Sequence, residues 1–254
     1  LEIYSALLKG NIWINVQPFQ YNNSENYSVG HPAITADGTT LYFVSDMPGG
    51  MGKSDIYYCE RTPQGGWSQP KNAGPIVNTD GKEVFPVVDK DGTLYFSSDG
   101  QGGLGGLDIF MTTGSRETWT TPVNLKSPLN SPKDDFSPLI IKQGESGYFS
   151  SNRDGGKGGD DIYYFRRRMV LVGIVKATLY GNNLTILPDA DVKIENIMYS
   201  RTDTLHSDAN GKFMQQSECG ARYNITATKS GYLKQAKSVE AICNGTSDTV
   251  YVEL

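Results

Sequence analysis

Apolar and polar positions alternate in short runs along the first two thirds of the chain, and these runs recur. The run Tyr-Phe-x-Ser-Asp, or Tyr-Phe-x-Ser-Asn, begins at Tyr42, Tyr95 and Tyr148, so successive copies start 53 residues apart. A Gly-rich stretch and a second run, Asp-Ile-Tyr or Asp-Ile-Phe, follow each copy. A fixed period with two β-type runs per unit is typical of propeller blades and short β arrays. The pattern therefore predicts an all-β fold built from repeated sheets.

Each unit is predicted to contain four strands. In the second copy they cover residues 84–88, 93–97, 108–112 and 119–125, and Asp91-Gly92 forms the first hairpin turn. Read backward, the period reaches Glu2-Ile3-Tyr4, which we expect to belong to an earlier unit, while the third copy runs into Arg166 before a fourth strand. We therefore expect residues 1–168 to form the C-terminal part of a six-bladed β-propeller. It would comprise half a blade followed by repeats near 31–82, 83–134 and 135–168.

The pattern changes at Met169. From there to residue 254, apolar and polar positions alternate in runs near 170–175, 192–195, 223–227 and 250–254. Alternation with period two predicts strands with one buried face. Such strands in a segment of this length favour a second domain, residues 169–254, that is a small β-sandwich.

Composition agrees with a β protein and argues against two function classes. The chain has 254 residues with 29 Gly, 12 Pro and 15 Tyr, and shows no long apolar period typical of helices. Its net charge of −5 and its scattered Lys and Arg residues argue against nucleic-acid binding, which needs clustered basic residues. No window reaches the roughly 18 apolar residues that a membrane helix needs, so we expect no membrane span in this chain.

Gly-rich loops between the second and third strands of each unit are the main candidates for function. They cover residues 46–55, 99–108 and 152–161. In an antiparallel blade they emerge on the same face as the connectors between units, near 72–83 and 124–135, so this face is the expected partner surface. Its candidate contact residues are Met47, Met51, Lys53, Gln101, Leu104, Arg153 and Lys157.

Three interpretations of these loops compete. The loops are similar to calcium-binding Gly/Asp repeats, in which carboxylates supply oxygen ligands; the weak metal candidates are Asp46, Asp55, Asp99, Asp108 and Asp161. In the structural interpretation, the aspartates accept backbone N–H bonds and the glycines permit the turn. A phosphate-binding loop is suggested by Gly52-Lys53-Ser54, but a strand follows where such a loop needs a helix. We favour the structural interpretation and expect no metal or other cofactor.

No catalytic constellation emerges from the sequence. His31 precedes Pro32 at the place that Phe85 occupies in the next repeat, so it is predicted to be a strand residue, and His206 lies in the second domain. No Gly-x-Ser-x-Gly segment occurs, which disfavours a serine hydrolase. We expect a protein that is not an enzyme, with a calcium- or glycan-binding propeller as the alternative and a hydrolase as the less favoured one.

The three cysteines occur in different contexts. Cys59 ends an apolar run and is predicted to be a small buried side chain. Cys219 and Cys243 lie after residue 169, each near a turn-like Gly. Two alternatives stay open, a disulfide between them or two reduced thiols, because sequence alone does not fix the geometry that a bridge requires. A bridge would indicate an oxidising compartment.

Both parts of the chain resemble known families. The repeats resemble the TolB-type propeller repeats of Bacteroidota envelope proteins of the OmpA family, through the segments Asp37-Gly38-x-x-Leu41-Tyr42-Phe43-x-Ser45-Asp46, Asp55-Ile56-Tyr57 and Trp67-x-x-Pro70-x-Asn72. The following domain resembles the carboxypeptidase regulatory-like, transthyretin-like sandwich of seven strands. The segments that carry this second resemblance are Val172-Gly173-x-Val175, Pro188-x-Ala190-x-Val192 and Asp208-x-Asn210-Gly211-x-Phe213.

The resemblance implies a location in the periplasm or at the outer membrane and a scaffold role without catalysis. Similar proteins include a periplasmic component of the type IX secretion machinery. The implied partners are therefore other envelope proteins of a secretion or peptidoglycan-associated assembly. Peptidoglycan itself would be bound only through an OmpA-like domain outside this sequence.

Overall fold

The regular elements of the structure are β-strands. The computed structural model describes residues 1–141, 146–166, 168–178, 184–218, 220–241 and 249–253. In these ranges no helix has the length and apolarity to cross a membrane. The chain divides into two compact units, residues 1–143 with 147–165 and residues 166–254 with 144–146. The prediction of an all-β fold is confirmed.

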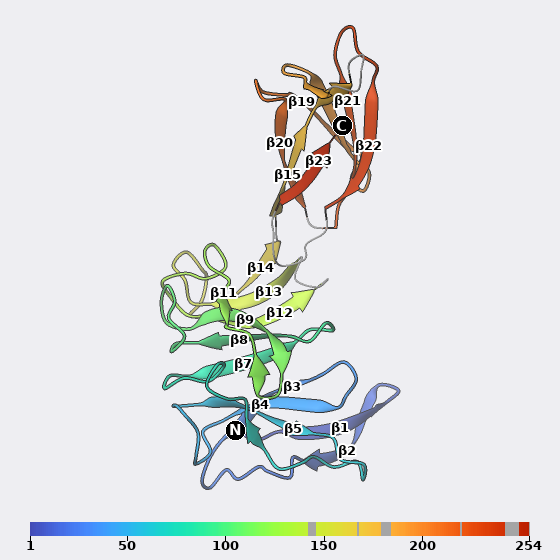
Figure 1. Cartoon of the computed structure of the whole chain (residues 1–254). Helices are drawn as coiled ribbons and strands as arrows, with labels where there is room; N and C mark the ends of the chain where they lie inside the picture. The colour runs from blue at the N-terminus through green and yellow to red at the C-terminus, as the bar shows by residue number, and fades with distance from the viewer. Residues whose placement is uncertain (142–145, 167, 179–183, 219, 242–248, 254) are drawn as a thin grey trace. The chain divides into compact units, whose positions relative to one another are not determined.

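The first unit consists of short sheets that follow one another along the chain (Figure 1). The strands up to residue 166 are β1 (Tyr4–Lys9), β2 (Ile12–Pro18), β3 (Val29–Ile34), β4 (Thr40–Ser45), β5 (Asp55–Glu60), β6 (Lys71–Asn72), β7 (Glu83–Val88), β8 (Thr93–Ser98), β9 (Asp108–Ser115), β10 (Thr118–Trp119), β11 (Val123–Asn124), β12 (Asp135–Ile141), β13 (Ser146–Ser151) and β14 (Asp161–Arg166). They form the sheets β1-β2, β3-β4-β5-β6, β7-β8-β9 with β10 and β11 both paired to β9, and β12-β13-β14.

Matching strands pair in matching ways because the apolar pattern repeats. Tyr42 of β4 lies opposite Tyr58 of β5, and Tyr95 of β8 lies opposite Met111 of β9. The strand predicted over residues 119–125 is an exception, since the structure has two short strands, β10 and β11, in its place. Pro122 lies between them and has no N–H to donate to a neighbouring strand.

The first strand of three sheets has an unusual backbone before its proline. His31, Phe85 and Ser137 each precede a proline and have φ angles of 48°, 52° and 53°. In the pairings of β3 with β4 and of β7 with β8, the register shifts at this place. Positive φ is unfavourable for residues with a Cβ. Its recurrence makes this bulge a regular part of the repeat, and the apolar pattern did not predict it.

The middle strands β4 and β8 are buried on both faces. Tyr42 and Val44 of β4 belong to a cluster that also contains Leu94 and Phe96 of β8. The alternate residues of β4, Leu41 and Phe43, belong to another cluster, which includes Ile3, Phe19 and Cys59. The sheet of β4 therefore packs one face on the sheet of β8 and the other face on the N-terminal residues Ile3 and Phe19.

The second unit has its own core. Its strands are β15 (Arg168–Ile174), β16 (Lys176–Thr178), β17 (Leu184–Ile186), β18 (Asp191–Asn196), β19 (Arg201–His206), β20 (Lys212–Glu218), β21 (Arg222–Thr228), β22 (Gln235–Glu240) and β23 (Thr249–Glu253). They form the sheets β20-β15-β23, β19-β18-β21-β22 and β16-β17. One buried cluster takes Leu171 and Phe213 from the first of these sheets and Val192, Ile194 and Ile225 from the second.

Candidate functional site

An aspartate closes each of the three Gly-rich loops. Asp55 accepts hydrogen bonds from the backbone N–H of Met51 at 2.5 Å and of Gly52 at 3.2 Å. Asp108 accepts the equivalent bonds from Leu104 and Gly105 at 2.5 and 3.4 Å, and Asp161 accepts them from Lys157 and Gly158 at 2.8 and 3.1 Å. These bonds fix the loops from within, as the structural interpretation of the sequence predicts.

A second side chain ties the other end of each loop to the last residue of the connector that leads into the same sheet. The Oδ1 atoms of Asp46 and Asp99 accept the backbone N–H of Ser28 and Lys82, both at 2.6 Å. In the third repeat Asn152 takes this place and accepts the N–H of Asp134 at 2.8 Å. The five aspartates proposed as weak metal candidates thus all bind backbone amides. In the described part of the chain, no group of three or more His, Cys, Asp or Glu side chains could hold a metal ion.

Three connectors lead from one sheet to the next (residues 19–28, 73–82 and 125–134). The first Gly-rich loop lies directly on the second connector, and the second loop lies directly on the third. A Cβ added to Gly52 would overlap the backbone of Thr79 and Gly81, and one added to Gly105 would overlap the backbone of Pro132. Lys53 also donates its N–H to the carbonyl of Gly81 at 2.8 Å. Loops and connectors therefore form one continuous face of the first unit.

Buried asparagines hold the connectors to the strands. Asn78 accepts the N–H of Ile56 at 2.8 Å and donates to its carbonyl at 2.9 Å, and Asn130 makes the same two bonds with Ile109 at the same distances. Each also donates to a second asparagine six residues earlier, Asn72 or Asn124, at 2.8 Å. In the N-terminal sheet Asn22 bonds the N–H and carbonyl of Ile3 at 3.0 and 2.8 Å. We call Asn22, Asn78 and Asn130 the connector asparagines.

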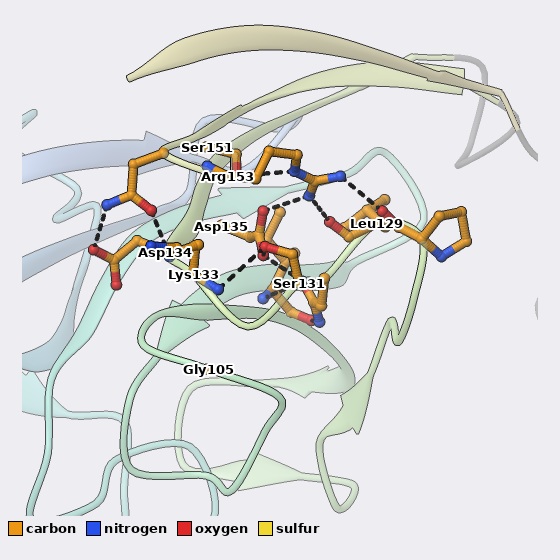
Figure 2. A network of polar contacts seen from close by, with 12 residues as sticks. Gly105, Leu129, Ser131, Lys133, Asp134, Asp135, Ser151 and Arg153 are labelled. Atoms are coloured by element: carbon orange, nitrogen blue, oxygen red, sulfur yellow. Dashed lines mark hydrogen bonds and ion pairs between the residues drawn. The ribbon is translucent and has the colours of Figure 1, made fainter. Parts of the chain in front are cut away.

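A buried carboxylate begins the first strand of the third and fourth sheets. Asp135 is fully buried and forms an ion pair with Arg153 at 2.5 Å (Figure 2). It also accepts bonds from the N–H and the hydroxyl of Ser131. Glu83, equally buried, accepts the equivalent bonds from Thr79, and the hydroxyl of Ser98 takes the place of the arginine. Burial raises the pKa of Glu83, the bonds from Ser98 and Thr79 oppose this shift, and the charge of Asp55 adds to it.

Three of the seven predicted partner-face residues are engaged within the chain. Arg153 donates to the carbonyls of Pro128 and Leu129 at 2.9 and 2.5 Å, beside its ion pair with Asp135 (Figure 2). Gln101 makes the matching bonds in the preceding repeat, to the carbonyls of Ile76 and Val77 at 3.0 and 2.9 Å. Met47 packs against the cluster around Phe43. These three side chains brace connectors and core, and their place on a partner face stays a prediction.

The other four predicted residues lie at exposed loop tips. Met51 and Leu104 are 46% and 49% exposed. Lys157 occupies the same place in the third loop, and Lys53 is exposed two residues after Met51. The most exposed of the seven predicted partner-face residues are therefore the loop tips Met51, Lys53, Leu104 and Lys157.

Each histidine contacts a side chain of its own unit. The ring of His31 stacks on Phe85 with centroids 4.0 Å apart, and Phe85 stacks on Phe136 at 5.3 Å. His31 Nδ1 accepts the N–H of Phe85 at 3.3 Å, and burial lowers the pKa of His31. His206 is exposed and lies 3.0 Å from the carboxylate of Asp191.

The cysteines are described only in part. Cys59 is fully buried, as predicted, and burial raises the pKa of its thiol to about 12. Cys219 and Cys243 lie outside the described residues, so their predicted alternatives, a disulfide or two thiols, stay open.

The connector asparagines were not predicted, although the sequence contains a signal for them. The spacing Pro-x-Asn-x5-Asn occurs at Pro70 and again at Pro122, each time followed by Thr or Ser. An asparagine repeated in two otherwise different connectors indicates a side chain that satisfies backbone groups.

Comparisons with known proteins give distant likenesses. No family model and no curated protein matches the sequence. A puromycin hydrolase mutant complexed with PGG matches 84% of this chain and 27% of its own, with 9% identity and a TM-score of 0.38. An exo-beta-1,3-galactanase from Clostridium thermocellum matches 92% of this chain and 59% of its own, with 14% identity and a TM-score of 0.37. The group B streptococcus pilus 2b backbone protein matches 90% of this chain at 9% identity, covering 96% of its own, with a TM-score of 0.29. Likenesses this distant carry no inference about function.

Proposed function

We propose that this chain is a non-catalytic interaction module of a bacterial cell-envelope protein. In this proposal residues 1–168 are the C-terminal part of a six-bladed, TolB-type propeller, and residues 169–254 are a carboxypeptidase regulatory-like sandwich of seven strands. Two observations support these folds. The sheets of the first unit repeat with the period of the sequence, and the second unit has one core between two of its sheets.

The observation that carries the interaction role is the set of braced loop tips. Each loop is held by the carboxylate of its own aspartate, and the first two also rest on a connector. Met51 and Leu104 are presented to solvent from this fixed backbone. Ile76 of the neighbouring connector is a further exposed apolar side chain at 42%. Exposed apolar groups on a preorganised surface favour binding, because little freedom is lost when a partner is bound.

The family resemblance extends the proposal to location and partners. The module would act in the periplasm or at the outer membrane, within a secretion or peptidoglycan-associated assembly such as the type IX secretion machinery. Its partners would be other envelope proteins of that assembly. Peptidoglycan would be bound by a separate domain.

The test uses a double variant of the loop tips, Met51→Glu with Leu104→Glu. Its matched control is Lys90→Glu, an exposed residue in the hairpin turn between β7 and β8, at the opposite end of the strands from the loops. Each form is incubated with an envelope extract of the source bacterium, cross-linked and analysed by mass spectrometry. The wild type and the control should recover the same envelope protein, and the double variant should lose it. Equal recovery by all three forms contradicts the proposal.

A further inference from the structure

A turn of the second unit exposes an apolar side chain between two lysines. The turn covers residues 229–234, Lys-Ser-Gly-Tyr-Leu-Lys, and joins β21 to β22. Leu233 is 91% exposed, the highest fraction among the exposed large apolar side chains that the structure describes. Tyr232 beside it is 39% exposed. A leucine with so little contact to its own chain adds little to the stability of the fold.

Leu233 belongs to a group of apolar side chains. Together with Tyr232 it lines a hollow that also contains Leu184 of β17, which is 68% exposed. Buried apolar residues line the same hollow: Val175, Leu187, Ala190 and Ala227. The group is therefore a patch and differs from a single leucine scattered on a surface. In the described lining of the hollow the charged residues are lysines, and no carboxylate is among them.

The turn is held in place while its positive charge stays uncompensated. Tyr232 donates its N–H to the carbonyl of Lys229 at 3.1 Å, and the ammonium group of Lys229 donates to the carbonyl of Pro188. This carbonyl fixes the lysine without neutralising it. In the described part of the chain, neither Lys229 nor Lys234 forms an ion pair with a carboxylate.

The acidic side chains that follow Pro188 contact another strand. The carboxylates of Asp189 and Asp191 lie 3.9 and 3.0 Å from Nδ1 of His206 in β19. In the sheet order β18 lies between β19 and β21, the strand that leads into the turn. The charges next to the exposed leucine are therefore those of the two lysines.

The turn lies at the end of the second unit that is away from the entry of the chain. The chain enters this unit through β15, which runs from Arg168 to Ile174. Val175, directly after the end of β15, lines the hollow together with Leu233. The turn and the hollow therefore lie at the end of the unit where β15 finishes.

A lipid surface fits this turn better than a protein surface does. A stable protein interface takes about 800 Å² from each partner, whereas the exposed apolar group here consists of three side chains. Insertion into a bilayer needs no matching shape, because leucine enters the apolar layer, tyrosine favours the boundary and lysines extend to the headgroups. Lysines near a membrane surface favour anionic lipids.

We propose that residues 229–234 bind the surface of an anionic lipid bilayer by inserting Leu233 between the headgroups. Tyr232 lies at the boundary of the apolar layer, and Lys229 and Lys234 contact the lipid phosphates. Such an attachment is weak and reversible, because one inserted side chain buries little apolar surface. The inference goes beyond the proposed function, which concerns protein partners and the loop tips of the first unit.

Co-sedimentation of the full chain with lipid vesicles tests the inference. One set of vesicles is pure phosphatidylcholine, and the other contains about one third phosphatidylglycerol, which is anionic. The chain should bind the anionic vesicles and bind the neutral ones much more weakly. An increase in salt from about 0.01 to 0.15 M should weaken binding, because salt screens the lysines.

Two matched variants test the part played by the turn. Leu233→Glu should weaken binding to anionic vesicles about tenfold or more, because an acidic group replaces the inserted side chain. The control is Ile197→Glu, since Ile197 is 52% exposed in the turn between β18 and β19. This control should bind as the wild type does. Lys234→Gln should weaken binding about fivefold through the loss of one charge.

Fluorescence identifies the inserted segment. All native tryptophans lie in the first unit. Brominated anionic lipid, which quenches a tryptophan that it contacts, should quench the variant Tyr232→Trp and leave the wild-type fluorescence unchanged. The two proposals also separate. Met51→Glu with Leu104→Glu should still bind vesicles, and Leu233→Glu should still recover the envelope protein.

Four results would overturn the inference. The first is the absence of co-sedimentation with anionic vesicles up to about 1 mM lipid. The second is equal binding by Leu233→Glu and the wild type. The third is equal quenching of the wild type and Tyr232→Trp, which would assign the membrane contact to the first unit. The fourth is loss of the envelope protein by Leu233→Glu, which would assign the turn to a protein partner.

Discussion

Replacing the connector asparagine Asn78 by alanine should destabilise the first unit strongly. Asn78 is 1% exposed, and its amide bonds both the N–H and the carbonyl of Ile56. Without it the buried N–H of Ile56 loses its acceptor, which costs about 1–3 kcal/mol. The carbonyl of Ile56 keeps a bond from Ala73 at 3.0 Å, so loss of the second bond costs less. We expect a decrease of about 2–4 kcal/mol in the free energy of unfolding.

Urea unfolding followed by tryptophan fluorescence measures this change directly. All three tryptophans, Trp13, Trp67 and Trp119, lie in the first unit, so the signal reports on that unit alone. The free energy is obtained by linear extrapolation to zero urea. The matched control is Asn26→Ala, because Asn26 is exposed and its amide donates to Asn23 at 2.9 Å. The control should stay within about 0.5 kcal/mol of the wild type. If Asn78→Ala unfolds as the control does, the asparagine bonds do not stabilise the connectors.

Four further predictions use the same unfolding assay or a thermal melt. Because burial lowers the pKa of His31 in the folded state, the unfolded state takes up this proton first, and stability should fall as the pH drops below about 6.5. His31→Phe should make the free energy of unfolding less dependent on pH between pH 7.5 and 5. An unchanged pH dependence would assign this loss of stability to another group. Arg153→Met should lower the free energy of unfolding by about 3–5 kcal/mol, because it leaves the charge of Asp135 buried without its ion pair. Adding Asp135→Asn to this variant should recover part of the lost stability. A double-mutant cycle that shows no coupling between the two residues would refute the pairing. Gly105→Val should lower the free energy of unfolding by about 1–3 kcal/mol, because the new side chain overlaps the next connector. Gly158→Val should change it by less than about 0.5 kcal/mol, because an added Cβ has room there. Equal effects of the two variants would contradict this difference in space. Calcium at about 1 mM should not raise the melting temperature, since the loop aspartates already bind amides; an increase would revive the metal interpretation.

The strands of the first unit were largely predictable from the sequence. Side-chain alternation has the same period in sequence and in structure, so the runs at Tyr42, Tyr95 and Tyr148 located the middle strands. The closure of the loops by Asp55 and Asp108 was also predictable, because aspartate next to glycine commonly bonds nearby amides. Both inferences depend on residues close together in the chain.

The contacts that could not be predicted join residues far apart. Gln101 and Arg153 both donate to carbonyls 24 or 25 residues earlier in the chain. Their direction is set by the packing of a loop on a connector, which local pattern does not contain. The exposure of Ile162 is a similar case, since its sequence context matches that of Ile56 and Ile109 and only the neighbour differs.

The connector asparagines impose an order on the making of the protein. Asn78 follows Ile56 by 22 residues, and Asn130 follows Ile109 by 21, so each sheet is completed by chain that is synthesised after it. At ordinary rates of translation this interval lasts about 1–4 s. During that time the third strand of the newest sheet has an open edge, and the sheets mature one after another from the N-terminus. Proteolysis of nascent chains stalled so that Asn78 lies just inside or just outside the ribosome would detect this delay as a gain in resistance.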